Sequence, residues 1–241
     1  MTHRITRRRA LTAAGTVSLG ALLAACGEDD APTTASEVPT TEGTTTTVGP
    51  QTTIADEDLF ANAGSCRVTT EQTEGPYYFD ADAIRSDIRE DREGTTLRLA
   101  IRVREAESCE PVANAVVDIW HCDAGGVYSG FDEGEGERFL RGAQVTNRNG
   151  IAEFTTIYPG WYPGRTPHIH AKVHLDRETV LTTQLYFDDE TSDRVYATTP
   201  YEPDRDQSND SDGIFDESLI LTLREEGDGY LGVIGFDVER A

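Results

Sequence analysis

The feature that most constrains the fold of this chain is a two-residue alternation of apolar and polar side chains, which recurs in short segments from residue 95 onward. In the segment 95–104, four aliphatic residues occupy alternate positions and three arginines fall at the others. Successive side chains of a β-strand point to opposite faces, so this pattern predicts a half-buried strand.

Similar segments predict further strands at 112–122, 143–146, 151–157, 168–175, 180–187, 217–223 and 230–238. Asn149-Gly150 favours a tight hairpin between the strands at 143–146 and 151–157. We also expect a short helical turn at 80–88. The many short strands predict an all-β fold, an antiparallel β-sandwich with long loops.

The first 26 residues have the features of a targeting segment rather than of the fold. Three arginines at 7–9 precede a short apolar run that ends in Leu23-Ala24-Ala25-Cys26. Twin arginines before a weakly hydrophobic run indicate the twin-arginine export route. The ending resembles a bacterial lipoprotein box, in which Cys26 is lipidated. A transmembrane anchor is the alternative, but it needs about 20 apolar residues.

Residues 27–64 are rich in Thr and acidic residues and contain no Lys or Arg, so we expect a disordered tether. Residues 65–241 are long enough for one domain with its own core. The full chain has 44 acidic against 21 basic residues and a formal net charge of −23. This balance argues against a nucleic-acid partner.

The cysteines fit an oxidising compartment. With Cys26 assigned to lipid, three cysteines remain. Cys122 ends an apolar strand segment, so we expect a free, buried thiol. Cys66 and Cys109 stand in polar, loop-like segments and are the better candidates for a disulfide, although the sequence leaves the connectivity open.

The clearest chemical signal is the pair His168 and His170 beside a rigid loop. Residues two apart leave the same face of a strand, so both imidazoles are aimed at one point. The preceding loop, 156–167, contains three prolines and two glycines and carries Tyr162. The sequence therefore predicts a metal site, with a solvated strand face as the alternative interpretation.

The donor types narrow the choice of metal. Structural zinc prefers Cys and His, whereas a phenolate is a hard oxygen donor suited to Fe(III). A second tyrosine, Tyr128, follows a Gly-Gly loop after the strand that ends at Trp120-His121-Cys122. It could place a second phenol near the first site.

Four segments in this order resemble the intradiol ring-cleavage dioxygenases, non-haem Fe(III) enzymes that open catechols between the two hydroxylated carbons. The segments are 73–78 (TEGPYY), 120–128 (WHCDAGGVY), 156–170 and 182–187 (TTQLYF). The resemblance implies that 65–241 is an intradiol dioxygenase β-sandwich domain. It also implies an enzyme, an oxidoreductase that incorporates both atoms of O2 and yields a muconate-type diacid.

The resemblance further implies four metal ligands, with Tyr128 and His168 equatorial and Tyr162 and His170 axial on Fe(III). Tyr162 would leave the iron when substrate binds and would accept one catechol proton. The implied partners are a small aromatic diol and O2.

Other residues matched to the family motifs have supporting roles. The resemblance implies that Arg165 stabilises anionic intermediates and that Gln184 hydrogen-bonds in the same region. Either Tyr77 or its neighbour Tyr78 would line the substrate pocket, and Tyr77 is our choice. His121 and His174 are expected to be structural, because one points away along its strand and the other lies roughly 13 Å beyond His170.

The leading hypothesis is therefore an exported dioxygenase, lipid-anchored through Cys26 to the outer face of a bacterial cell membrane. A lipoprotein that binds ferric iron or a catecholate siderophore without turnover is the alternative, and a zinc hydrolase is a weaker one. Arg165 and Gln184 favour the enzyme, because simple capture has no evident use for them. The sequence leaves open which catechol is the substrate and what the oligomeric state is.

Overall fold

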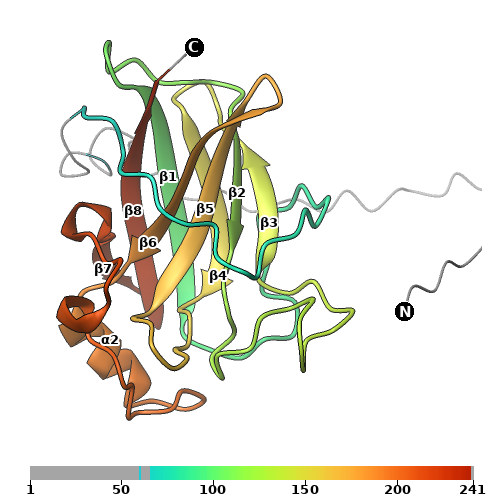
Figure 1. Cartoon of the computed structure of the whole chain (residues 1–241), viewed down its shortest axis with the longest axis vertical. Helices are drawn as coiled ribbons and strands as arrows, with labels where there is room; N and C mark the ends of the chain where they lie inside the picture. Colours follow the sequence, from blue (N-terminus) through green and yellow to red (C-terminus); the bar gives the residue numbers. More distant parts are fainter. Residues whose placement is uncertain (1–59, 61–65, 240–241) are drawn as a thin grey trace, which may run out of the picture. The chain divides into compact units, whose positions relative to one another are not determined.

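Two four-stranded β-sheets lie face to face and form most of the described structure (Figure 1). The computed structural model describes residue 60 and residues 66–239. The first sheet has the order β4-β1-β8-β7, in which the strands are Ile151–Ile157, Thr96–Glu105, Gly229–Val238 and Thr222–Glu226. The second has the order β3-β2-β5-β6, in which the strands are Arg141–Val145, Val116–Trp120, His168–Leu175 and Glu178–Tyr186. The predicted β-sandwich is confirmed.

One strand pair departs from the antiparallel expectation. β1 and β8 are parallel neighbours, with Leu97 opposite Tyr230 and Glu105 opposite Val238. All other pairs of named strands are antiparallel. A parallel pair needs a long connection, and here nearly the whole domain separates the two strands.

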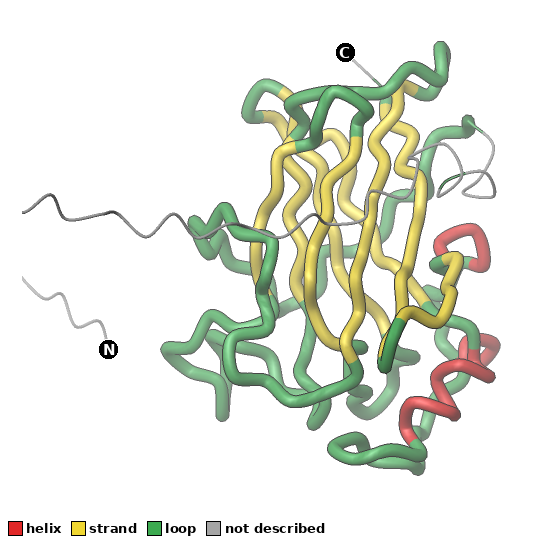
Figure 2. The backbone as a smooth tube through the Cα atoms, turned by 180° about the vertical axis from the view of Figure 1, so that it is seen from behind, coloured by secondary structure: helices red, strands yellow, loops and turns green. Residues whose placement is uncertain are grey.

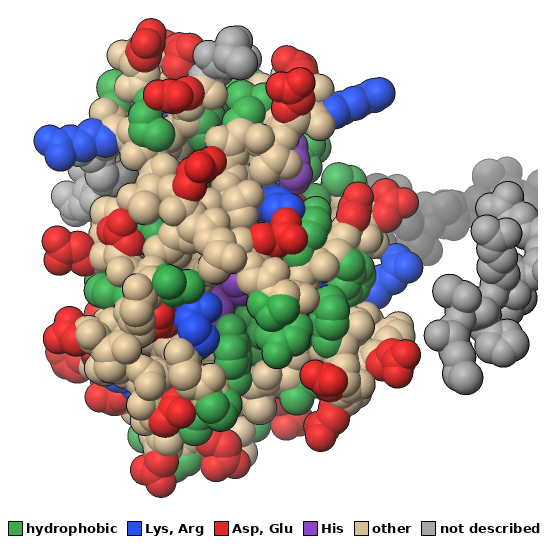
Figure 3. All heavy atoms as spheres, in the orientation of Figure 1, with side chains coloured by type: hydrophobic (Ala, Val, Ile, Leu, Met, Phe, Trp, Pro, Cys, Tyr) green, Lys and Arg blue, Asp and Glu red, His purple; other side chains and the backbone are tan. Residues whose placement is uncertain are grey.

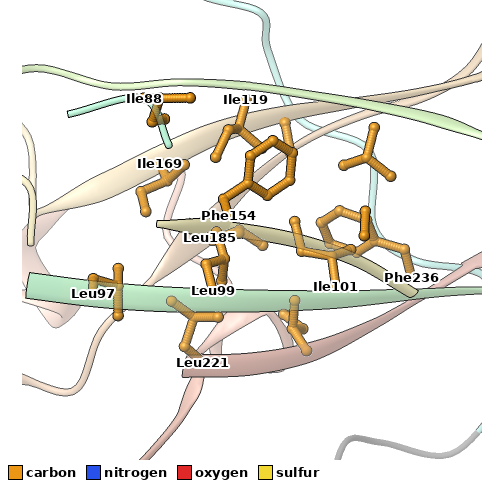
Figure 4. Close-up of a cluster of buried hydrophobic side chains, with 14 of the residues drawn as sticks. Ile88, Leu97, Leu99, Ile101, Ile119, Phe154, Ile169, Leu185, Leu221 and Phe236 are labelled. Carbon is orange, nitrogen blue, oxygen red and sulfur yellow. The ribbon is translucent and has the colours of Figure 1, made fainter. Parts of the chain in front are cut away.

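The core lies between the two sheets, where the predicted alternation of β1 is realised. Its four aliphatic side chains at 97, 99, 101 and 103 are each at most 1% exposed. They belong to one cluster with Ile119 and Ile169 of the second sheet and Phe154 and Phe236 of the first (Figure 4). Burial of a side chain of this size stabilises the fold by roughly 1.5–3 kcal/mol.

The expected helical turn at 80–88 is wrong, because this segment is extended. Ile84 bridges to Ala143 at the edge of β3, and Asp87 bridges to Thr155 at the edge of β4. The open edges of the two sheets offer backbone partners that a lone helical turn lacks. The segment therefore ties the two sheets together along one side.

Two further expectations need correction near the carboxyl end of the chain. Part of the strand predicted at 217–223 is a 3-10 helix, Glu217–Leu219, because Asp216 caps it by accepting from Ser218 N. The helix α2, Asp189–Tyr196, was not predicted at all. Two features of the sequence could have indicated this helix. Asp188 is its N-cap and accepts from Thr191 N through its side chain, and acidic residues follow in the first turn. Another 3-10 helix spans Asn209–Ser211.

The predicted disulfide is present. Cys66 and Cys109 are bonded, with Cα atoms 5.7 Å apart, and Cys122 is free and buried as expected. The bond links the beginning of the continuously described segment to the turn after β1. It closes a loop that restricts the unfolded chain.

Phe60 packs on the outer face of the first sheet. It is 8% exposed and belongs to one hydrophobic cluster with Ala100, Ile151, Leu231 and Val233. The guanidinium of Arg102 lies 4.5 Å from its ring centroid. The rest of the expected tether and signal, with Cys26, lies outside the described residues, and no helix within them is long and apolar enough to cross a membrane.

Long loops gather at one end of the sandwich, with α2 beside them (Figure 2). They include the connection from β2 to β3 and the connection from β4 to β5. These two connections carry the tyrosines and the rigid loop that the sequence analysis singled out.

Candidate metal centre

Strand β5 aims His168 and His170 away from the sandwich core. The intervening Ile169 and Ala171 are fully buried between the sheets, so the histidines lie on the opposite face of the second sheet. His170 is the register partner of Trp120 on β2 and of Gln184 on β6. Trp120, His170 and Gln184 therefore form one row across three strands. This row is the floor of a site on the outer face of the second sheet.

Two glycines allow close backbone packing between the two loops that carry the tyrosines. Gly160 N donates to Asp123 O at 3.0 Å, and a Cβ on Gly160 would lie 2.4 Å from that same oxygen. On the other side, a Cβ on Gly126 would lie 2.5 Å from Trp161 O. Only glycine permits these approaches. The loops with Tyr128 and Tyr162 are thus held in fixed relation to each other.

Four aromatic rings meet over the sheet as a result. The ring centroids of Tyr128 and Tyr162 are 5.8 Å apart, and those of His168 and His170 are 4.8 Å apart. Tyr162 lies 5.6 Å from His168, and Tyr128 lies 6.2 Å from His170. The structure brings together all four side chains that the sequence analysis named as metal ligands.

Hydrogen bonds define the tautomer of His168. Its Nδ1 lies 2.7 Å from Thr166 O, and because a carbonyl can only accept, Nδ1 carries the proton. Nε2 is then free to accept from Tyr162 Oη, 3.1 Å away. A carbonyl behind the imidazole that leaves Nε2 facing inward is the usual support of a histidine ligand.

Burial keeps all four rings neutral in the absence of a cation. It lowers the pKa of His168 to about 3 and lowers the pKa of His170 well below its ordinary value. It raises the pKa of Tyr162 to about 12 and the pKa of Tyr128 far above its ordinary value. Neutral imidazoles are ready to bind a metal, whereas the phenols would need a strongly charged cation to ionise.

Several potential metal-donor atoms of these four side chains have no hydrogen-bond partner. Tyr128 Oη and both ring nitrogens of His170 are buried and make no hydrogen bond. Buried polar groups are normally hydrogen-bonded, so these atoms indicate a missing ligand. No described group of three or more His, Cys, Asp or Glu side chains could hold a metal ion, and only two of the four donors here are of those types.

Arg165 is fixed beside the four rings by three side chains. Its Nη2 donates to Gln184 Oε1 at 2.6 Å and its Nε donates to Asp212 Oδ2 at 2.8 Å, while Nη1 lies 3.4 Å from His168 Nε2. Gln184 in turn donates from Nε2 to Thr73 O at 3.0 Å. The network holds a positive charge next to the buried donors.

A cavity of about 510 Å³ opens beside the rings, and Tyr77, Tyr128 and Tyr162 line it. Tyr77 stacks on Tyr128 with centroids 4.5 Å apart. Tyr78 lies elsewhere, under Lys172 Nζ, which is 3.6 Å from its ring centroid. Of the two adjacent tyrosines, Tyr77 is therefore the one that lines the pocket. Figure 3 shows histidine, basic and hydrophobic side chains meeting on this face of the molecule.

Both the sequence and the fold match known proteins. A sequence model of a family described as dioxygenase matches residues 73–201. The chain belongs to the intradiol dioxygenase family.

Solved structures agree with this assignment. An intradiol ring-cleavage dioxygenase from Tetranychus urticae is 36% identical, with a TM-score of 0.69, and the match covers 72% of this chain and 95% of that one. The dioxygenase domain of a carbohydrate-binding fusion protein from Streptomyces sp. SirexAA-E is 32% identical, with a TM-score of 0.57 over 72% of this chain and 99% of that one.

Curated relatives are longer than the matched region. Catechol 1,2-dioxygenase of Acinetobacter baylyi is 30% identical over 207 residues, which is 70% of this chain and 66% of that protein. A chlorocatechol 1,2-dioxygenase of Pseudomonas putida is matched over 61% of its length. The chain thus spans about three fifths of the length of such relatives.

The candidate site also contains residues that the sequence analysis missed. Asp212 holds Arg165 and accepts from Thr166 N at 3.0 Å, Trp120 stacks on His170, and Gly75 stands so close that a Cβ would lie 3.1 Å from His170 Cε1. Gly75 and Trp120 occur in the matched motifs, which were available signals. Asp212 comes from a distant loop with no motif of its own.

The two remaining histidines have hydrogen-bond partners outside the group of four rings. His121 is fully buried and bonded to Cys122 O and Thr156 Oγ1, both at 2.7 Å. His174 lies farther along β5, where its Nδ1 is 3.0 Å from Thr179 Oγ1. Both have partners of their own within the fold.

Proposed function

We propose that this protein is a non-haem Fe(III) dioxygenase that cleaves a catechol-type ring between its two hydroxylated carbons with O2, giving a muconate-type diacid. One observation carries the proposal: two phenols that line a cavity lie against two buried imidazoles, and several donor atoms of this group have no hydrogen-bond partner. Family membership supports the reaction class.

Tyr128, Tyr162, His168 and His170 would hold the iron. Bound Fe(III) supplies a Lewis acid that orients and polarises a catechol dianion toward O2. Two phenolates offset most of the charge of a trivalent ion, whereas an all-histidine site would not. The donor set therefore fits Fe(III) better than zinc.

The protein's own groups would prepare the substrate. Tyr162 Oη is the base for one catechol hydroxyl proton, because it belongs both to the donor set and to the cavity lining. Tyr77 offers a ring face against which the substrate can pack. Arg165, held by Gln184 and Asp212, stabilises negative charge that develops on the ring.

The test is a visible spectrum of the ferric-reconstituted chain before and after addition of catechol in air, with dissolved O2 followed in the same cuvette. We expect a phenolate-to-iron band that shifts with catechol, followed by oxygen uptake and a muconate absorbance. A shift without oxygen uptake would instead support an iron- or siderophore-binding protein. A colourless chain that binds no iron would refute the site.

Single substitutions assign the roles. Tyr162→Phe should weaken the band and slow turnover, and His170→Ala should lose iron. Tyr230→Phe is the matched control, because Tyr230 lies on β8 of the other sheet. A variant without His168 and His170 that still bound iron fully would contradict the assignment.

We also propose export by the twin-arginine route and a lipid anchor on Cys26, on the support of Arg7 to Arg9 and the residues before Cys26. In a bacterial host with that route, the full chain should fractionate with membranes and incorporate labelled fatty acid. Cys26→Ala should abolish the labelling. Equal labelling of the variant would refute the anchor.

A further inference from the structure

One wall of the substrate cavity is acidic. Besides Tyr77, Tyr128 and Tyr162, the cavity is lined by Phe131, Asp132 and Glu133, and its described lining includes no Lys or Arg. Both carboxylates are exposed at the surface, and neither has an ion-pair partner among the described residues. Any ring substituent that projects toward this wall meets uncompensated negative charge.

Backbone hydrogen bonds hold the loop that carries these carboxylates. Gly130 N donates to Gly134 O at 2.7 Å, and Glu135 N donates to Asp132 O at 3.1 Å. Phe131 anchors the loop to the cavity, since its ring centroid lies 5.3 Å from that of Tyr77. The acidic wall is thus part of a folded turn.

Two arginines lie near the cavity but outside its described lining. Arg141 is 1% exposed, lies 5.6 Å from the ring centroid of Phe131, and donates from Nη2 to Ser129 O at 2.8 Å. Arg165 pairs with Asp212. Neither residue lines the cavity, and the formal net charge of the chain is −23. Asp132 and Glu133 are therefore the only charged side chains in the described lining of the cavity.

We propose that Asp132 and Glu133 determine substrate selectivity, so that the enzyme discriminates against catechols with an anionic ring substituent and favours neutral or cationic ones. This inference rests on the proposed function. Exposed charges are screened by water, so each carboxylate should change selectivity by roughly two- to fivefold at low salt. The effect should shrink at about 0.5 M salt, where the Debye length is only a few ångströms.

The experiment compares kcat/KM of the iron-loaded full chain for catechol, 3,4-dihydroxybenzoate and 4-(2-aminoethyl)catechol. The D132N/E133Q variant removes both charges from the wall. E135Q/E137Q is the matched control, since Glu135 and Glu137 are exposed on the same loop but do not line the cavity. Ratios between substrates are compared between proteins, which cancels the electronic effect of each substituent.

In D132N/E133Q, we expect the preference for catechol over 3,4-dihydroxybenzoate to fall on the order of tenfold, and the relative rate with the amine to fall as well. The control pair should change both ratios less than twofold. Unchanged ratios, or equal changes in the two variants, would overturn the proposal.

Failure of the proposed function would look different. If no substrate is cleaved by any of the proteins, the dioxygenase assignment fails, and calorimetric affinities of the same three compounds decide the charge effect. The acidic wall would still be supported if the wild type bound 3,4-dihydroxybenzoate more weakly than catechol and if D132N/E133Q, but not E135Q/E137Q, reduced this difference. The proposal would be overturned if neither D132N/E133Q nor E135Q/E137Q changed these affinities.

Discussion

The imidazole of His170 lies flat against the indole of Trp120, with ring centroids 4.9 Å apart and planes 3° apart. The two residues are register partners on β5 and β2, so the sheet itself creates the stack. On the floor of the proposed metal site, Trp120 holds the orientation of a ring whose nitrogens make no hydrogen bonds.

Replacing Trp120 should therefore loosen His170. We expect Trp120→Leu to weaken ferric affinity about 10- to 100-fold, the range for residues that orient a ligand. Trp120→Phe keeps an aromatic face and should lose less. Ferric titration followed by the visible band measures both variants, and equal affinities for Leu and Phe would show that stacking is irrelevant.

Gly75 should be needed for its lack of a side chain as well as for its backbone angle. Gly75 and Gly164 have φ values of +71° and +86°, so alanine should cost each about 1 kcal/mol of stability. Only Gly75→Ala would also press on His170, because nothing lies within 4 Å of a Cβ at Gly164.

We thus expect similar denaturant midpoints for Gly75→Ala and Gly164→Ala, with loss of iron and activity only in the former. Full iron binding by folded Gly75→Ala would contradict this account.

The pair of Arg165 and Asp212 should behave as a unit. The Asp212 side chain is 2% exposed and that of Arg165 is 18% exposed, so removal of either partner leaves a poorly solvated charge. Breaking a buried pair of this kind typically costs about 3–5 kcal/mol. A double-mutant cycle of Arg165→Met and Asp212→Asn, followed by urea unfolding, should show strong non-additivity.

Asp193→Asn is the surface comparison for that cycle. Asp193 pairs with Arg205 but its side chain is 68% exposed, so we expect a cost below about 1 kcal/mol. Additive effects of the Arg165 and Asp212 substitutions would show that the two residues act independently.

His121 should make the fold sensitive to acid. Burial lowers its pKa from 6.5 to about 4, so between these values the unfolded chain binds a proton that the folded chain does not. Stability from this group is therefore present above about pH 6.5 and lost as pH falls toward 4. At pH 5 the loss is about 2 kcal/mol.

The comparison of wild type with His121→Gln isolates this effect, because every other titrating group is common to both proteins. Unfolding free energies of the metal-free chains should converge as pH falls from 7 to 5. A constant difference across that range would mean that His121 does not titrate in this way.

The sequence motifs singled out four side chains that the fold brings together, whereas the helical turn expected at 80–88 was wrong. His168 and His170 are two residues apart, so strand geometry alone places them on one face. The segment 80–88 was expected to be helical, yet it is extended because the edges of β3 and β4 supply hydrogen-bond partners from distant parts of the chain. Local sequence carries no information about such edges.

The sequence by itself determined the sandwich and the candidate side chains for a disulfide and for a metal site, because alternation, polarity and motif order are local properties. Only the tertiary structure decided which neighbours serve that site. Asp212 reaches Arg165 across 47 residues of chain, and Tyr77 rather than Tyr78 meets the cavity. Both outcomes depend on how loops from separate strands pack, and that packing is decided by the whole domain at once.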